Sequence, residues 1–205
     1  SKIKNSKLNY SGNLSINPFD LSLNANLNSH KVSKLFNINS ILTEFIRSGL
    51  FFNKNISVNT SMAVSSDIKN EIFKDAKINF NIVNGKINFN NTKFINEDIG
   101  LLQLNNSNLF IKNNNLVLKT DILVSIKNSN NLFSFLNTNK KYRKEIKNIL
   151  INIDYNFLNN QIKFNNIKVD NNEVSDQFLA IIDGFKNNNF NNLNKSRILI
   201  NELFQ

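Results

Sequence analysis

The side chains that most often carry out enzyme chemistry are few in this sequence, and they are scattered. His30 is the only histidine and there is no cysteine, so neither a multi-histidine metal site nor a thiolate site can form. The closest carboxylates are Glu97 with Asp98 and Asp170 with Glu173. Both pairs fall where turns and helix starts favour acidic residues. Phosphate-binding and nucleophile-elbow motifs are also missing. We therefore predict a protein that is not an enzyme and uses no metal or cofactor.

The formal net charge of +10 raises nucleic acid as a partner. Nearly all cations are Lys, however, and the preference for Asn, Lys, Ile and Phe is typical of AT-rich codons. The Phe residues alternate in phase with Ile and Leu, so they are not placed to stack on bases. We interpret the Lys residues, including the dense cluster at 140–147, as a solvated surface. Contact with anionic lipid headgroups is the alternative, and no nucleic acid partner is expected.

Apolar and polar residues alternate through most of the chain, most clearly in Lys77–Ile126. Side chains of a strand point to opposite faces with period two, so this pattern predicts strands with one apolar and one polar face. Asn84-Gly85 lies between two such runs and predicts a hairpin with a type I′ turn over Lys77–Asn90. A second hairpin is predicted over Ile149–Val169, with a bulge near Asn165-Asn166. The expected fold is mainly β, a curved antiparallel sheet with one apolar side.

Three segments change to a helical period and are predicted as short helices, at about 33–49, 130–137 and 173–185. Gly49 could end the first of them in a left-handed conformation. The alternating pattern from end to end favours a single domain over residues 1–205. The sequence contains no membrane span or signal peptide and begins without Met inside a strand pattern. We therefore expect a fragment of a longer protein, with any anchor lying upstream.

The predicted helices are too narrow to cover the apolar side of the sheet. About ten strands spaced ~4.8 Å apart make a sheet ~50 Å wide, whereas a helix is ~10 Å wide. Part of the apolar side is therefore expected to remain open as a groove that suits acyl chains. The residues expected to line this groove and bind lipid are Ile78, Phe80, Ile82, Ile87, Phe89, Leu109, Ile111, Leu116, Leu118, Ile151, Ile153, Phe157, Ile162 and Phe164.

Several stretches of the chain resemble one known family in wording and order. They are NGKINFNNTKF, then LLQLNNSNLFIKNNNLVL, the Phe-rich break LFSFL and NIDYNFLNNQIKFNNIKVDNNEV, with DLSLNANL near the start. Over residues 55–185 this pattern resembles the C-terminal β-groove region of AsmA-like proteins of bacteria. The family's N-terminal transmembrane helix is not in this chain.

The resemblance implies a module of a Gram-negative cell-envelope protein, largely periplasmic and anchored in the inner membrane by a segment outside this chain. Its repeating β-groove would pass phospholipid toward the outer membrane and so contribute to outer-membrane biogenesis. Its partners would be phospholipid acyl chains and the membrane. The alternative is a structural or adhesive β-solenoid or β-sandwich whose core is closed and binds no ligand.

Overall fold

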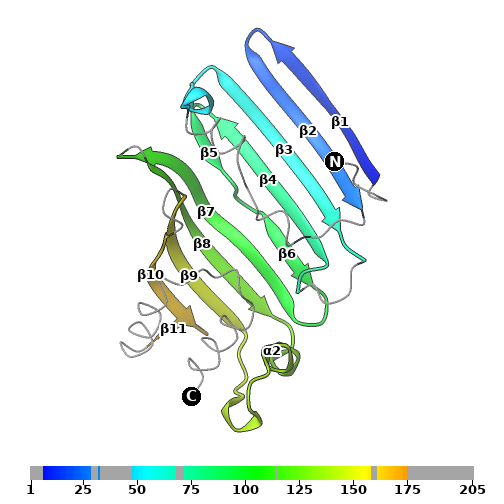
Figure 1. Ribbon diagram of the computed structural model, residues 1–205, viewed down its shortest axis with the longest axis vertical. Helices are drawn as coiled ribbons and strands as arrows, with labels where there is room; N and C mark the ends of the chain where they lie inside the picture. The colour runs from blue at the N-terminus through cyan, green and yellow to red at the C-terminus, as the bar shows by residue number, and fades with distance from the viewer. Residues whose placement is uncertain are drawn as a thin grey trace.

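The computed structural model describes residues 7–28, 32, 48–67, 72–113, 115–157 and 161–174. Within these ranges the chain is mainly β and forms one curved sheet (Figure 1). The class predicted from the period-two alternation is therefore confirmed. The strands are β1 (Lys7–Ile16), β2 (Phe19–Asn28), β3 (Ile56–Ser65), β4 (Asp75–Val83), β5 (Lys86–Asn88), β6 (Lys93–Asn96), β7 (Gly100–Lys112), β8 (Asn115–Ile126), β9 (Asn148–Asn156), β10 (Gln161–Val169) and β11 (Asn172–Glu173).

The strands lie across the sheet almost in chain order, from β1 at one edge to β11 at the other (Figure 1). Strands β5 and β6 share one position, because both lie between β4 and β7. Short turns join β1 to β2, β4 to β5, β6 to β7 and β10 to β11, and each of these turns links antiparallel neighbours. This order explains why the alternating pattern of the sequence produces one continuous sheet.

One pair of strands differs from the expected antiparallel arrangement. Strands β2 and β3 are parallel, with Phe19 opposite Ile56 and Asn28 opposite Ser65. A parallel pair needs a crossover connection of a dozen residues or more, and the segment between residues 28 and 56 is long enough to provide one. The sheet is therefore mixed. Period-two alternation is the same in both arrangements, so the sequence pattern did not distinguish them.

The Asn-rich turns have the conformations that their composition predicts. Asn84 and Gly85 have φ values of 51° and 70°, as the predicted type I′ turn requires, and they join β4 to β5. Asn91, Asn106 and Asn113 also have positive φ. Asn enters the left-handed region more easily than most residues, so the abundant Asn serves the turns and irregular positions of this sheet.

The predicted helix at 130–137 is present as α2 (Ser129–Leu136), which lies at one end of the sheet (Figure 1). The Asn128 side chain accepts a hydrogen bond from the Asn131 backbone N–H, and Asn137 closes the helix in the left-handed conformation. Phe133 and Leu136 are buried. The helix begins one residue earlier than predicted, because the Asn128 side chain provides its cap.

The other two predicted helices lie mainly outside the described residues. This holds for 33–47 of the helix predicted at 33–49 and for 175–185 of the helix predicted at 173–185. Gly49 has the left-handed conformation expected of it, with φ of 82°, and precedes a short 3-10 helix, η2 (Leu50–Phe52). Glu173 was predicted to begin the helix at 173–185. It is instead the last residue of β11, where it lies opposite Lys168. A second 3-10 helix, η3, spans Lys140–Tyr142.

Candidate functional site

All the residues expected to contact lipid belong to one side of the sheet. The strand register gives a continuous series across it: Ile82 lies opposite Ile87, which lies opposite Leu109, which lies opposite Leu118. Farther along, Ile153 lies opposite Phe164. Residues directly opposite each other on paired strands point to the same face. We call this side the apolar face, and the other side, where Asn and Lys prevail, the polar face.

The residues of the apolar face differ in how far they are covered. Ile82 and Ile87 have no exposed surface, whereas Ile111 is 42% exposed. The buried members of the expected set are Ile82, Ile87, Leu109, Leu116 and Ile153. The half-buried members are Ile78, Phe80, Phe89, Leu118, Ile151, Phe157, Ile162 and Phe164. The face therefore combines a dry part with a larger part whose side chains remain partly accessible.

The buried side chains of this face form two clusters. The first contains Val58, Ile82, Ile87, Leu109 and Leu116, and Phe80 and Phe89 pack against it with their ring centroids 5.4 Å apart. The second contains Val32, Val64, Ala76 and Phe94. In the second cluster Phe73 packs on Phe94 at 5.7 Å between centroids. The first cluster contains several residues expected to line a groove, so part of that prediction falls on a packed core.

Between the two clusters lies a row of hydroxyl residues that sequence reasoning missed, formed by Thr60, Thr92, Ser107 and Thr120. The Thr60 hydroxyl donates to the Phe80 carbonyl at 2.9 Å, and the Thr120 hydroxyl donates to the Asn105 carbonyl at 3.2 Å. Because these donors are already paired with backbone carbonyls, they have no free hydrogen for a ligand. We call this set the hydroxyl row.

Thr92 and Ser107 belong to the place where the sheet is irregular. The Thr92 hydroxyl donates to the Asn79 carbonyl at 3.2 Å and accepts from the Asn79 N–H at 3.0 Å, so it replaces ladder bonds missing between β5 and β6. Ser107 lies in the bulge of β7, where its N–H donates to the Asn90 side-chain oxygen at 2.6 Å. The Ser107 hydroxyl is buried and has no hydrogen-bond partner. A parity change between Phe89 and Phe94 was the available sequence signal for this break.

The polar face is held by side-chain hydrogen bonds that cross several strands. The Asn106 amide donates to the Asp121 carboxylate at 2.7 Å, and the Asn152 amide donates to the other oxygen of the same carboxylate. The Asn165 amide then donates to the Asn152 side-chain oxygen at 3.0 Å. Asp121 is thereby satisfied by neutral donors, and its role is to connect β7, β8 and β9.

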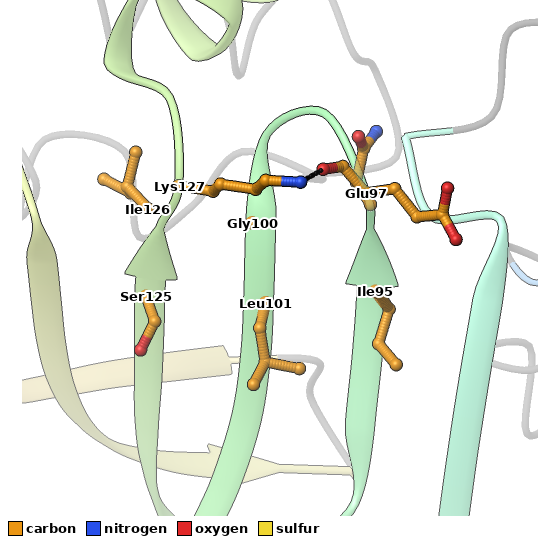
Figure 2. A pocket seen from close by; sticks show the side chains of 8 residues that line it. Ile95, Glu97, Gly100, Leu101, Ser125, Ile126 and Lys127 are labelled. Carbon is orange, nitrogen blue, oxygen red and sulfur yellow. Dashed lines mark hydrogen bonds between the residues drawn. The ribbon is translucent and has the colours of Figure 1, made fainter.

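A hollow of about 500 Å³ lies on the polar face near the β6–β7 turn (Figure 2). The side chains of Ile95, Leu101 and Ser125 lie side by side on three neighbouring strands, and the Lys127 ammonium donates to the Glu97 carbonyl at 2.9 Å. Gly100 permits the close strand approach here, since a Cβ atom would lie 2.1 Å from the Ser125 carbonyl oxygen. None of the expected lipid-lining residues takes part in this hollow.

A second hollow, of about 470 Å³, lies where β7, β8, β9 and β10 end. Its wall carries Lys112, Lys163 and Asp154, and Ile162 is the one expected lining residue among those that form it. Opposite charges and amides dominate this site, so it suits a polar group better than an acyl chain. Both hollows therefore differ in character from the apolar face.

The two carboxylate pairs of the sequence lie in turns or, for Glu173, in β11. The Asp170 carboxylate accepts from the backbone N–H groups of Lys147 and Asn148 at 2.8 and 2.7 Å. Glu97 and Asp98 are exposed turn residues. Burial on the apolar face raises the pKa of the Tyr155 hydroxyl, because apolar surroundings disfavour the charged phenolate. No group of three acidic or histidine residues able to hold a metal occurs in the described ranges, and His30 lies outside them.

The basic segment at 140–147 is tied to α2. The Arg143 guanidinium donates to the Thr138 carbonyl at 3.0 Å and to the Ser134 hydroxyl at 3.3 Å, while the Lys141 ammonium lies 4.4 Å from the centre of the Tyr142 ring. The ion pair between Glu145 and Lys147 is exposed and contributes little to stability. Among the described residues, no helix is both long and apolar enough to span a membrane.

Comparison with known proteins gives no match for this chain: no family model, no curated protein and no solved structure is similar to it. The AsmA-like resemblance therefore stays a prediction that rests on the residues quoted for it.

Proposed function

We propose that the apolar face binds the acyl chains of phospholipid and lets them pass along the sheet. The observation that carries this proposal is the placement of every expected lining residue on one face, with many of them only half-buried. Burial of acyl carbons gains about 0.8 kcal/mol per CH₂. About ten carbons buried against Ile151, Phe164 and their neighbours would gain about 8 kcal/mol, which corresponds to retention in the micromolar range.

The chemistry of the face favours movement over fixed binding. The hydroxyls of Thr60 and Thr120 already donate to backbone carbonyls, so they offer the ester oxygens of a lipid no orienting donor. Hydrophobic contact is not directional, and an apolar chain that slides by one carbon exchanges one similar contact for another. The protein is thus proposed to be a conduit without a catalytic step.

The resemblance to AsmA-like proteins supports a location for this activity. On that basis we propose that the chain is a periplasmic module of a cell-envelope protein, anchored in the inner membrane through a segment outside it. Phospholipid would pass between the inner and outer membranes along the sheet. The Lys and Asn side chains of the polar face would then meet water.

One observation favours the second candidate, a structural β domain with a closed core. Ile82 and Ile87 are fully covered by the protein itself, as the core of a ligand-free domain would be. The two candidates differ in the half-buried part of the face, where only the first requires access for lipid.

The test uses two neighbouring residues of β9 that point to opposite faces. Ile151 belongs to the apolar face, whereas Leu150, which is 38% exposed, belongs to the polar face. Purified protein is extracted with organic solvent and analysed by mass spectrometry for bound phospholipid. We expect phospholipid in the parent protein and in Leu150→Asn, and several-fold less in Ile151→Asn.

Circular dichroism and thermal melting establish that both variants are folded before their lipid content is compared. A folded parent protein without bound lipid that also fails to take up an added fluorescent fatty acid would contradict the proposal and favour the closed core. An equal loss of lipid in both variants would also contradict it, because the loss would not depend on the apolar face.

A further inference from the structure

The edge strand β1 carries apolar side chains that remain exposed. Leu8, Tyr10, Leu14 and Ile16 are exposed by 57%, 74%, 62% and 82%. Among the described residues β1 pairs with β2 alone, and that pairing runs through all ten residues without a bulge. A long and regular edge strand presents a row of backbone N–H and C=O groups that can pair with another strand.

The two edges of the sheet differ in the features that normally prevent such pairing. In β1 the one charged side chain is that of Lys7, at the start of the strand, and residues 8–16 contain no charge and no proline. At the other edge β11 has only two residues, and β10 beside it is bulged and carries Lys163 and Lys168. Short strands, bulges and lysines are the usual means by which proteins protect an edge. The β11 edge is therefore protected, whereas the β1 edge is not.

The sequence of β1 is complementary to itself in the antiparallel direction. A pairing of two copies centred on Gly12 places Leu8 of one copy opposite Ile16 of the second copy. It also places Tyr10 opposite Leu14 of the second copy. Apolar side chains then meet across the new strand pair on one face, and Asn and Ser meet on the other. Cross-strand apolar pairs of this kind stabilise a sheet.

We propose that two copies of this chain associate through their β1 strands, edge to edge and antiparallel, about a twofold axis at Gly12. The apolar faces of the two copies then lie on the same side, so the pairing doubles the width of that face. Because the β11 edge is protected and the twofold contact is closed, assembly stops at the dimer. This inference does not depend on lipid binding.

Charge and size set the strength of this contact. Each copy has a formal net charge of +10, so two copies repel each other at a distance. Within the contact strand only Lys7, its first residue, is charged, and it lies outside the paired residues 8–16. Salt screens long-range repulsion, and we therefore expect dimerisation to strengthen as ionic strength rises. A single strand on each side is smaller than the ~20–30 residues a side of a stable interface, so the dimer should dissociate in the micromolar range.

The first experiment measures molar mass by light scattering after size-exclusion chromatography over a series of protein concentrations. We expect a shift from monomer to dimer as concentration rises. Leu14→Lys, which places a charge in the contact, should weaken dimerisation by about tenfold or more. Asn172→Lys, which places the same charge at the other edge, should leave it unchanged. A monomer at all concentrations, open-ended oligomers, or equal effects of the two variants would overturn the proposal.

The second experiment tests the register. The chain has no cysteine, so cysteines can be introduced without competing thiols. Asn9 lies opposite Ser15 of the second copy in the proposed pairing, and these two positions are too far apart along one strand to join within a copy. The variant Asn9→Cys with Ser15→Cys should form a disulfide-linked dimer under mild oxidation. Asn9→Cys with Asn13→Cys, which do not meet in this register, should not. A dimer with equal crosslinking in both variants would overturn the Gly12-centred pairing.

Discussion

Ser107 and Thr120 are neighbouring hydroxyl residues of the apolar face, with 0% and 1% of their surface exposed. Only the Thr120 hydroxyl has a partner, the Asn105 carbonyl. An unpaired buried hydroxyl costs free energy, whereas a paired one stabilises by about 1 kcal/mol. We predict that Ser107→Ala leaves the free energy of unfolding unchanged or raises it, and that Thr120→Val lowers it by about 1 kcal/mol. Urea unfolding followed by circular dichroism measures both values.

Each variant is the control for the other, because both remove one hydroxyl from the same row with little change in volume. A loss of more than about 1 kcal/mol in Ser107→Ala would mean that its hydroxyl is satisfied after all. The sequence did not reveal this row, because a single Thr or Ser within an alternating strand is compatible with either face. Burial of these hydroxyls depends on strand pairing, which brings together residues far apart in the chain.

At the scale of elements, the β4–β5 turn depends on Gly85 for two reasons. Its φ of 70° is unfavourable for other residues, and a Cβ atom would lie 2.4 Å from the Phe52 carbonyl oxygen of η2. Gly49 also has a positive φ, but no atom lies within 4 Å of the position of its Cβ. We predict that Gly85→Ala lowers the free energy of unfolding by about 2–3 kcal/mol and Gly49→Ala by only about 1 kcal/mol.

Chemical denaturation of the two glycine variants gives the comparison directly, since the conformational cost is common to both. The difference between them reports the contact of the turn with η2. Equal losses would show that η2 moves aside without cost, and the packing of Phe52 near the turn would then contribute nothing to stability.

The elements that the sequence predicted correctly are those defined by local signals. Asn84-Gly85 defined one turn, and the changed spacing between Phe164 and Ile167 located the bulge that the strand register shows between Phe164 and Asn166. The parallel pairing of β2 with β3 was not predicted, because it depends on a distant crossover. The place of β6 beside β5, between β4 and β7, was also not predicted, since the expected hairpin ended at Asn90.

The same distinction holds for the candidate site. Alternation was enough to assign the expected residues to one face, as the pairing of Ile87 with Leu109 illustrates. It was not enough to separate Ile82, which is fully covered, from Ile111, which is exposed. Coverage depends on what packs above the sheet and on the curvature of the strands, and neither is encoded in the period of a single strand.

At the scale of the whole molecule, the sheet separates its two kinds of surface. The apolar face is lined by aliphatic and phenyl side chains, whereas the charged residues Lys119, Asp154 and Lys163 meet in register on the polar face. Any binding that depends on the apolar face should therefore respond to the length of an acyl chain and not to salt. Binding through the polar face should show the opposite dependence.

The separation of the two faces predicts how fatty acids should bind. In a series of fluorescent fatty acids with the same headgroup, each added CH₂ that enters the face should strengthen binding by up to about fourfold, corresponding to about 0.8 kcal/mol. This gain per CH₂ should change little when the salt concentration is raised, because the added contacts carry no charge. Fluorescence titration of the parent protein and of Leu150→Asn should agree, and Ile151→Asn should lose the dependence on chain length. An affinity that falls with salt and ignores chain length would assign the binding to the lysines of the polar face, and the apolar face would then be core.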